Sequence, residues 1–100
     1  MARKVDGVIE AVRYRNGQIV MVRAYERRGA TFSDHVLLER KALVERLQKG
    51  LRFSVGSREE LKASTFKLGP EVQLVKQNGQ EWIATRPQAT ADLLDGAPVF

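Results

Sequence analysis

The chain has 100 residues, of which 43% are hydrophobic and 29% charged, and it carries a formal net charge of +5. This length indicates one domain, because two halves would each be too small to bury an adequate core. The sequence contains no cysteine, no run of roughly 20 apolar residues that could span a membrane, and no signal-peptide pattern. We therefore expect a cytoplasmic protein that has no disulfides and is not bound to a membrane.

The basic charge is concentrated in the body of the chain. All 17 basic residues precede position 87, whereas Asp92 and Asp95 follow it. A body of this charge favours association with a polyanion, namely RNA, DNA or an acidic protein, through phosphate contacts and the release of counterions. The alternative is a surface whose positive charge only keeps the protein soluble.

The first predicted element is a β-hairpin. The segments Val5 to Arg15 and Gln18 to Arg27 flank Asn16-Gly17, the strongest short-range signal for a two-residue type I′ turn. This turn fixes the register of the strands and therefore the composition of each face. One face pairs Tyr14 with Ile19, Val12 with Met21, Glu10 with Arg23, Val8 with Tyr25 and Asp6 with Arg27. The other face pairs Arg13 with Val20, Ala11 with Val22, Ile9 with Ala24 and Gly7 with Glu26. Its uniformly apolar middle makes this second face the predicted core face.

The middle of the chain contains one predicted helix. Residues Arg40 to Lys49 place apolar side chains at helical spacing and end before Gly50, a residue typical of helix termination. We favour a short strand from His35 to Leu38 before this helix over a helix start capped by Asp34. Alternation of apolar and polar side chains predicts a further strand from Leu51 to Val55.

Turn signals follow this strand. Ser57 and Glu60 match a capping box, which predicts one helical turn at residues 58–62. Thr65 to Leu68 is a candidate short strand, and Gly69-Pro70 is expected to end it.

A second hairpin and a tail complete the chain. Val72 to Gln77 and Gln80 to Thr85 flank Asn78-Gly79, which pairs Lys76 with Glu81, Val75 with Trp82 and Leu74 with Ile83. We assign residues 1–86 to a single domain and expect residues 87–100 to form a loose tail, since they contain two prolines and no sustained periodicity. The alternative is docking on the body or on a neighbouring molecule by Leu93, Leu94, Val99 and Phe100.

These elements predict an α+β fold. A mostly antiparallel β-sheet would form a small open or closed barrel, with one inserted α-helix near residues 40–49 covering one end or face. The segment DGVIEAVRYRNGQIVMV resembles the first hairpin of OB-like or SH3-like barrels, and OB domains commonly carry a helix after their third strand. The resemblance implies the fold only, because such folds host many functions.

Residue types that make catalytic and metal sites are scarce. His35 is the only histidine, so the usual zinc ligands are missing. Glu59 and Glu60 would point in different directions on a helical turn, and capping explains Glu60. The glycines match neither a phosphate-binding loop nor a dinucleotide fingerprint. We therefore expect a non-catalytic protein with no metal site and no cofactor.

The best candidate for a binding surface is the first face of the first hairpin. Its side chains would offer aromatic rings to bases and guanidinium groups to phosphates of single-stranded RNA or DNA. The candidate nucleic-acid-binding residues are Tyr14, Arg23, Tyr25, Arg27 and Arg28. The structural alternative is that Glu10 and Asp6 neutralise the arginines and both tyrosines pack inside. A third hypothesis buries this rather apolar face in a homodimer, which would make the chain a protein-interaction module.

Overall fold

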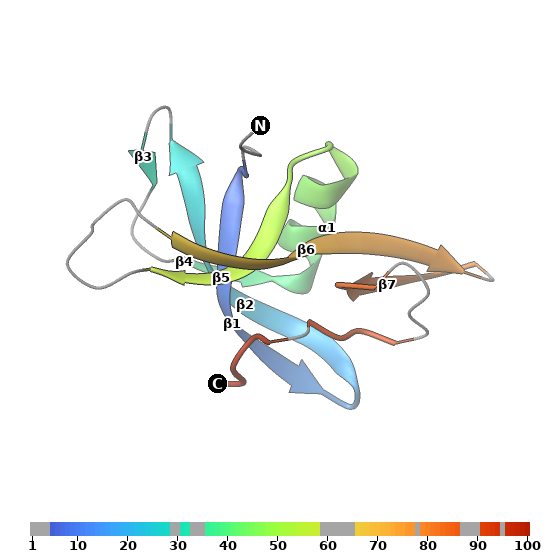
Figure 1. The fold of residues 1–100 in the computed structure, drawn as a ribbon. Coiled ribbons are helices and arrows are strands. Elements are labelled where there is room, and N and C mark those ends of the chain that lie inside the picture. Colours follow the sequence, from blue (N-terminus) through green and yellow to red (C-terminus); the bar gives the residue numbers. More distant parts are fainter. Residues whose placement is uncertain are drawn as a thin grey trace.

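The computed structural model describes residues 5–28, 31–32, 36–58, 66–77, 79–86, 91–94 and 96–100. These residues form seven strands and one helix (Figure 1). In chain order the elements are β1 (Gly7–Arg15), β2 (Gln18–Arg28), β3 (Thr31–Phe32), β4 (Val36–Glu39), α1 (Arg40–Gln48), β5 (Phe53–Arg58), β6 (Phe66–Gln77) and β7 (Gln80–Ala84). The predicted α+β fold, built mostly from β-sheet, is confirmed. Within the described ranges, no helix has the length and apolar character that crossing a membrane requires.

The strands form one sheet that stays open. Its order is β3-β2-β1-β5-β6-β7, and β4 also pairs with β2. The pairs between these strands are antiparallel except that of β1 with β5. The closed form of the predicted barrel is not formed, because β3 and β7, the two ends of this order, do not pair with each other. The outer edge of β7 instead meets Leu93 of the tail. The backbone of Leu93 bonds there to Ile83 and Thr85.

The β1–β2 hairpin has the predicted turn and, at its two ends, the predicted register. Asn16 and Gly17 have φ angles of 52° and 77°, and a type I′ turn requires positive values at both positions. Between the two ends, Glu10 on β1 and Val20 on β2 each stand as an extra residue in a β-bulge. The pairing between the two bulges is therefore shifted by one residue.

These bulges correct the predicted division of the hairpin into faces. A shift of one residue moves a side chain to the opposite face of a sheet. The core face carries Ile9, Val12, Tyr14, Ile19, Val22 and Ala24. The other face, called here the arginine face, carries Val8, Ala11, Arg13, Arg15, Met21, Arg23 and Tyr25. Arg13 and Arg23, which the sequence places on different faces, consequently share one.

The helix packs on the core side of the sheet. Its contacts are with β2, β4 and β6, and its fully buried Leu43 joins Phe53 and Leu38 in the core cluster. The span of α1 confirms the predicted helix. The strand β4 confirms the short strand expected before it, although His35 lies outside the described residues.

Two predictions about turns are wrong. Ser57 belongs to β5, because it pairs with β6 rather than capping a helical turn; residues 59–62 lie outside the described part of the chain. Strand β6 continues through Gly69 and Pro70 instead of ending there. Both residues lie opposite Val55 in a β-bulge. Proline has no backbone N–H, and at a bulge the hydrogen-bond ladder does not need one. A Cβ atom at Gly69 would lie 3.2 Å from the carbonyl oxygen of Val55, so glycine permits this close approach.

The β6–β7 hairpin agrees with its prediction. Pairs of facing residues are Lys76 with Glu81, Val75 with Trp82 and Leu74 with Ile83. Gly79 has a φ angle of 77°, and Asn78 lies outside the described residues. The Asn-Gly signal therefore sets the register of both hairpins at their turns.

The described residues after position 90 dock on the body, which corrects the expected loose tail. Asp92 and Leu94 are 4% and 2% exposed, and Leu94 belongs to the core cluster. Further on, residues 98–100 lie beside β1, where the N–H and the carbonyl of Val12 both bond to their backbone. In Figure 1 this last part of the chain runs from β7 to the β1–β2 hairpin. Apolar packing and backbone pairing thus make it part of the domain.

Candidate nucleic-acid interface

Tyr25, the central aromatic residue of the predicted interface, is used by the fold. It is 5% exposed, and its hydroxyl donates a hydrogen bond to Oε2 of Glu10 at 2.8 Å. A ring buried in this way offers no face on which a nucleobase could stack.

Arg23 has the carboxylate neighbour that the sequence indicates. Its Nη1 lies 3.7 Å from Oε1 of Glu10, even though the bulge places Ala11 directly opposite Arg23. The side chain of Arg23 is 36% exposed. An ion pair this accessible to water contributes little to stability, typically about 0–1 kcal/mol. Its guanidinium group is therefore held loosely and remains partly open to solvent.

Tyr14 lies on the core face, opposite to Arg23. It packs against the core cluster, and its hydroxyl accepts a hydrogen bond from the backbone N–H of Leu94 at 3.1 Å. Its role in this structure is to receive the docked tail.

Arg27 and Arg28 lie at the far end of β2. Nε of Arg27 donates to the carbonyl of Val5 at 2.8 Å. The backbone of Arg28 pairs with β3, and its side chain is not among the described parts of the chain. At about 3.3 Å per residue, roughly 26 Å of strand separates Arg27 from Ile19, the partner of Tyr14. The five predicted residues are therefore not brought together on one surface.

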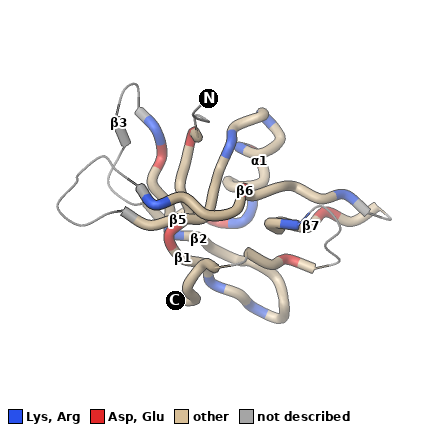
Figure 2. The backbone as a smooth tube through the Cα atoms, in the orientation of Figure 1, with Lys and Arg blue, Asp and Glu red and all other residues tan. Residues whose placement is uncertain are grey.

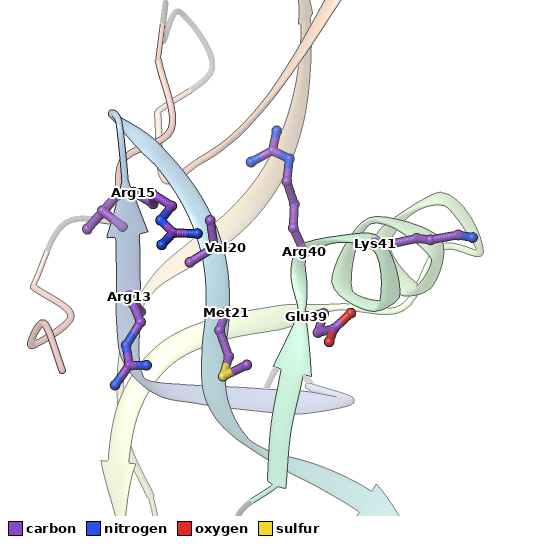
Figure 3. Close-up of a pocket in the computed structure, with 8 residues that line it drawn as sticks. Arg13, Arg15, Val20, Met21, Glu39, Arg40 and Lys41 are labelled. Carbon is purple, nitrogen blue, oxygen red and sulfur yellow. The ribbon is translucent and has the colours of Figure 1, made fainter.

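A different basic surface lies where the hairpin meets the junction of β4 and α1. A hollow of about 490 Å³ at this place, called here the basic hollow, is lined by Arg13, Tyr14, Arg15, Val20, Met21, Glu39, Arg40 and Lys41 (Figure 3). Arg13 and Arg15 are two residues apart on β1 and so project from the same face. Four of the eight lining residues are basic and one is acidic, so the hollow attracts anions.

Among the described residues, three of these cations pair with no Asp or Glu side chain, and Arg13 donates instead to the backbone oxygen of Phe100. Arg15 and Lys41 are exposed, and neither they nor Arg13 forms an ion pair with an Asp or Glu in the described part of the chain. Figure 3 shows Arg15 beside Val20, whereas the side chain of Lys41 extends across α1 and away from the hairpin. Figure 2 shows the other basic positions distributed over the fold, among them positions on α1 and β6. The hollow thus has accessible guanidinium groups on β1, and the ammonium group of Lys41 lies at its outer side.

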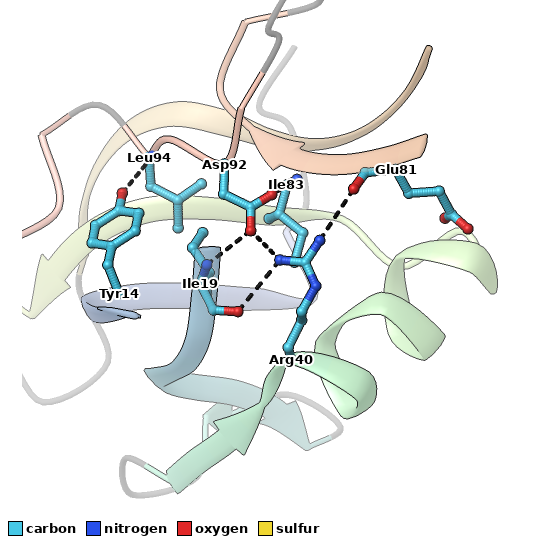
Figure 4. Close-up of polar contacts among 7 residues, drawn as sticks. All are labelled: Tyr14, Ile19, Arg40, Glu81, Ile83, Asp92 and Leu94. Atoms are coloured by element: carbon cyan, nitrogen blue, oxygen red, sulfur yellow. Dashed lines mark hydrogen bonds and ion pairs between the residues drawn. The ribbon is translucent and has the colours of Figure 1, made fainter. Parts of the chain in front are cut away.

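The fourth cation, Arg40, is fixed by a buried carboxylate (Figure 4). The side chain of Asp92 is 0% exposed and forms an ion pair with Arg40. Its two oxygens also accept hydrogen bonds at 2.8 Å from the backbone N–H groups of Ile19 and Ile83. Arg40 in turn donates to the carbonyls of Ile19 and Glu81 at 3.3 Å and 3.1 Å. This group, called here the Asp92 anchor, ties β2, β7, α1 and the tail together and fixes one wall of the hollow.

Sequence reasoning missed both the hollow and the anchor. Arg40 and Asp92 are 52 positions apart, so no local pattern relates them. The signal for the anchor in the sequence is Asp92 itself, an acidic residue followed by Leu93 and Leu94. A charge next to apolar residues that dock is a candidate for burial with a partner.

Other site chemistry is not seen in the described ranges. No group there of three or more His, Cys, Asp or Glu residues could hold a metal ion, and His35 lies outside those ranges. Comparisons with protein-family models, with curated proteins and with solved structures found no match.

Proposed function

We propose that this domain is a non-catalytic, cytoplasmic binding module that holds the phosphate backbone of single-stranded RNA or DNA at the basic hollow. The observation that carries the proposal is the set of three cations there, Arg13, Arg15 and Lys41, which pair with no Asp or Glu side chain in the described part of the chain. Cations left in this state bind phosphate by releasing the counterions that surround the nucleic acid.

The side chains of the hollow have different roles in binding. The planar guanidinium groups of Arg13 and Arg15 match the two oxygens of a phosphate, and Lys41 supplies a mobile point charge. Between them, Val20 and Met21 are only partly buried and offer an apolar surface to a base or a sugar. Phosphate contacts carry no sequence information, so we expect little preference for any sequence.

The size of the hollow supports a flexible single strand. Its volume of about 490 Å³ lies within the roughly 300–1,000 Å³ that is typical of small-ligand sites. One or two units of an unpaired strand can enter such a concave site with their phosphates against the arginines. The net charge of +5 assists the approach of the strand.

The proposal is tested by titrating the protein into a fluorescently labelled single-stranded oligonucleotide at several salt concentrations. Three phosphate contacts on a single strand should give a slope of about −2 for the logarithm of the association constant against that of the salt concentration. Absence of binding, or binding that salt does not weaken, would contradict the proposal.

A protein-interaction role is the second candidate, and one observation favours it. Leu37 on β4 is 56% exposed, and β4 has β2 as its strand neighbour on one edge while no described strand covers the other. Such an edge can pair with another chain. The face originally expected in a homodimer is used inside the fold, since Val8, Val12 and Ile19 are fully buried. Light scattering of the wild type and of Leu37→Glu tests this role: a dimer that the substitution dissociates supports it, and a wild-type monomer contradicts self-association.

A further inference from the structure

Two arginines of the hairpin meet the ring of Phe100. The Cζ atoms of Arg13 and Arg23 each lie 4.8 Å from the centre of this ring. A guanidinium group within about 6 Å of an aromatic centre attracts the face of the ring. The two bulges make this arrangement possible, because they bring Arg13 and Arg23 to the same face of the hairpin.

The segment that carries Phe100 is held mainly through its backbone. The N–H of Val12 donates to the carbonyl of Pro98 at 2.8 Å, and the N–H of Phe100 donates to the carbonyl of Val12 at 3.0 Å. Nε of Arg13 donates a further bond to the backbone oxygen of Phe100 at 3.1 Å. Little apolar surface is buried here, since Pro98 is exposed, Val99 is 68% exposed and Phe100 is only partly buried.

The two docked parts of the tail differ in how firmly they are attached. Asp92 and Leu94 are almost completely buried and belong to the anchor and the core. Gly96 follows them with a φ angle of 84°, a conformation that favours glycine, and no atom lies near the position of a Cβ. Residues 98–100 can therefore leave β1 while Ala97, which packs against the core, and the Asp92 anchor stay in place.

We propose that the Arg13–Arg23 pair is a base-binding subsite for single-stranded nucleic acid, and that Phe100 is an occupant from the same chain which a base displaces. This inference rests on the proposed function, because Arg13 belongs both to the subsite and to the basic hollow. Bases of single strands stack on guanidinium planes as they do on aromatic side chains. Phe100 presents the same kind of flat π-face that a base presents.

The surroundings of the subsite favour a base attached to a phosphate over an aromatic side chain from another protein. Arg15 lies two residues beyond Arg13, about 7 Å along β1, and has no Asp or Glu partner among the described residues. A nucleotide whose base takes the place of Phe100 brings a negative charge to this second guanidinium. A phenylalanine or tyrosine of a protein brings none.

Phe100 lowers the apparent affinity of the subsite for a base. While Phe100 occupies the pair, a ligand must first displace it, and the apparent affinity falls by the fraction of molecules in which the pair is free. The two exposed contacts between the ring and the guanidinium groups, which Phe100→Ala removes, make the expected reduction about five- to tenfold. Phe100 does not change the affinity of ligands that contact only the phosphate sites.

The test compares an oligothymidylate with an abasic oligonucleotide of the same length, using the full chain and its Phe100→Ala variant. Without the competing ring, the variant should bind the oligothymidylate about five- to tenfold more tightly than the wild type does. Its affinity for the abasic strand should stay within about twofold of the wild type. Circular dichroism and thermal melting check that each variant is folded.

Two matched variants sharpen the result. Phe100→Tyr keeps the ring and should bind both strands as the wild type does. Adding Arg23→Gln to Phe100→Ala removes half of the subsite and should abolish the gain for the oligothymidylate.

Each outcome of these titrations either supports the base-binding subsite or contradicts it. An equal gain for both strands, or no gain for the oligothymidylate, overturns the subsite while the proposed function stands. Failure of the wild type and the variants to bind either strand overturns the proposed function and the subsite together. If a phenylalanine-containing peptide competes for the freed site and the oligothymidylate does not, the occupant is a protein and the proposal is wrong.

Discussion

Arg40, the first residue of α1, forms an ion pair with the fully buried carboxylate of Asp92 in the tail. The carboxylate also accepts the N–H groups of Ile19 and Ile83, so one acidic side chain connects four parts of the fold. Because a buried carboxylate with complete hydrogen bonding cannot be removed without leaving its partners unsatisfied, the pair is the main polar determinant of how the tail docks.

Replacing this carboxylate should destabilise the whole domain. Asp92→Ala leaves two buried N–H groups and the guanidinium of Arg40 without their acceptor, so we expect the free energy of unfolding to fall by about 3–5 kcal/mol. Urea unfolding followed by circular dichroism measures this. Glu81→Ala is the matched control, because Arg40 bonds to its backbone carbonyl, which the substitution keeps. A loss below about 1 kcal/mol for Asp92→Ala would contradict the anchor.

The parallel contact between β1 and β5 requires glycine at position 7. A Cβ atom there would lie 2.3 Å from the ring of Phe53, which faces Gly7 across the strand pair and is 1% exposed. We expect Gly7→Ala to lower the free energy of unfolding by about 1–3 kcal/mol, since a buried ring has little room to move.

A double-mutant cycle checks the cause of this loss. Phe53→Leu removes the edge of the ring that meets the new methyl group, so Gly7→Ala should cost less in the Phe53→Leu background than in the wild type. Equal costs in both backgrounds would show that the ring is not the obstacle.

The sequence could predict the turns of the two hairpins but not the faces of the first one. Asn16-Gly17 specifies its turn locally, and the register next to it follows. The bulges at Glu10 and Val20 have no such local signal, because they arise when one curved hairpin must pack on both sides. Because of these bulges, Tyr14 lies on the face opposite to Arg23, and Arg13 lies on the same face as Arg23.

The tail shows the same limit for contacts between distant residues. Residues 91–100 lack helical or strand periodicity, so their sequence indicates a loose segment. Their placement depends on partners at Ile19, Ile83 and Val12, which only the folded chain brings near. Gly69 and Pro70 are similar, since a bulge opposite Val55 turns a strong turn signal into the middle of β6.

The burial of Tyr25 implies that it acts in the fold and not in binding. We expect Tyr25→Leu to lower stability by about 2–3 kcal/mol, because it removes buried ring surface and the hydrogen bond to Glu10. Measured well below its melting temperature, the variant should bind an oligothymidylate within about twofold of the wild type. A loss of affinity of about tenfold or more in a folded variant would show that Tyr25 takes part in binding.

The most direct test of the account is a comparison of two double variants that lose the same charge. Arg15→Gln with Lys41→Gln removes two cations of the basic hollow, whereas Lys67→Gln with Lys76→Gln removes two exposed cations of β6. Both are titrated with a single-stranded oligonucleotide over a range of salt concentrations. The account requires the salt slope of the hollow variant to fall in magnitude by about 1.4, for two lost phosphate contacts, with that of the β6 variant nearly unchanged. Equal effects of the two variants would show that net charge alone attracts the nucleic acid and would contradict the assignment of the hollow as its site.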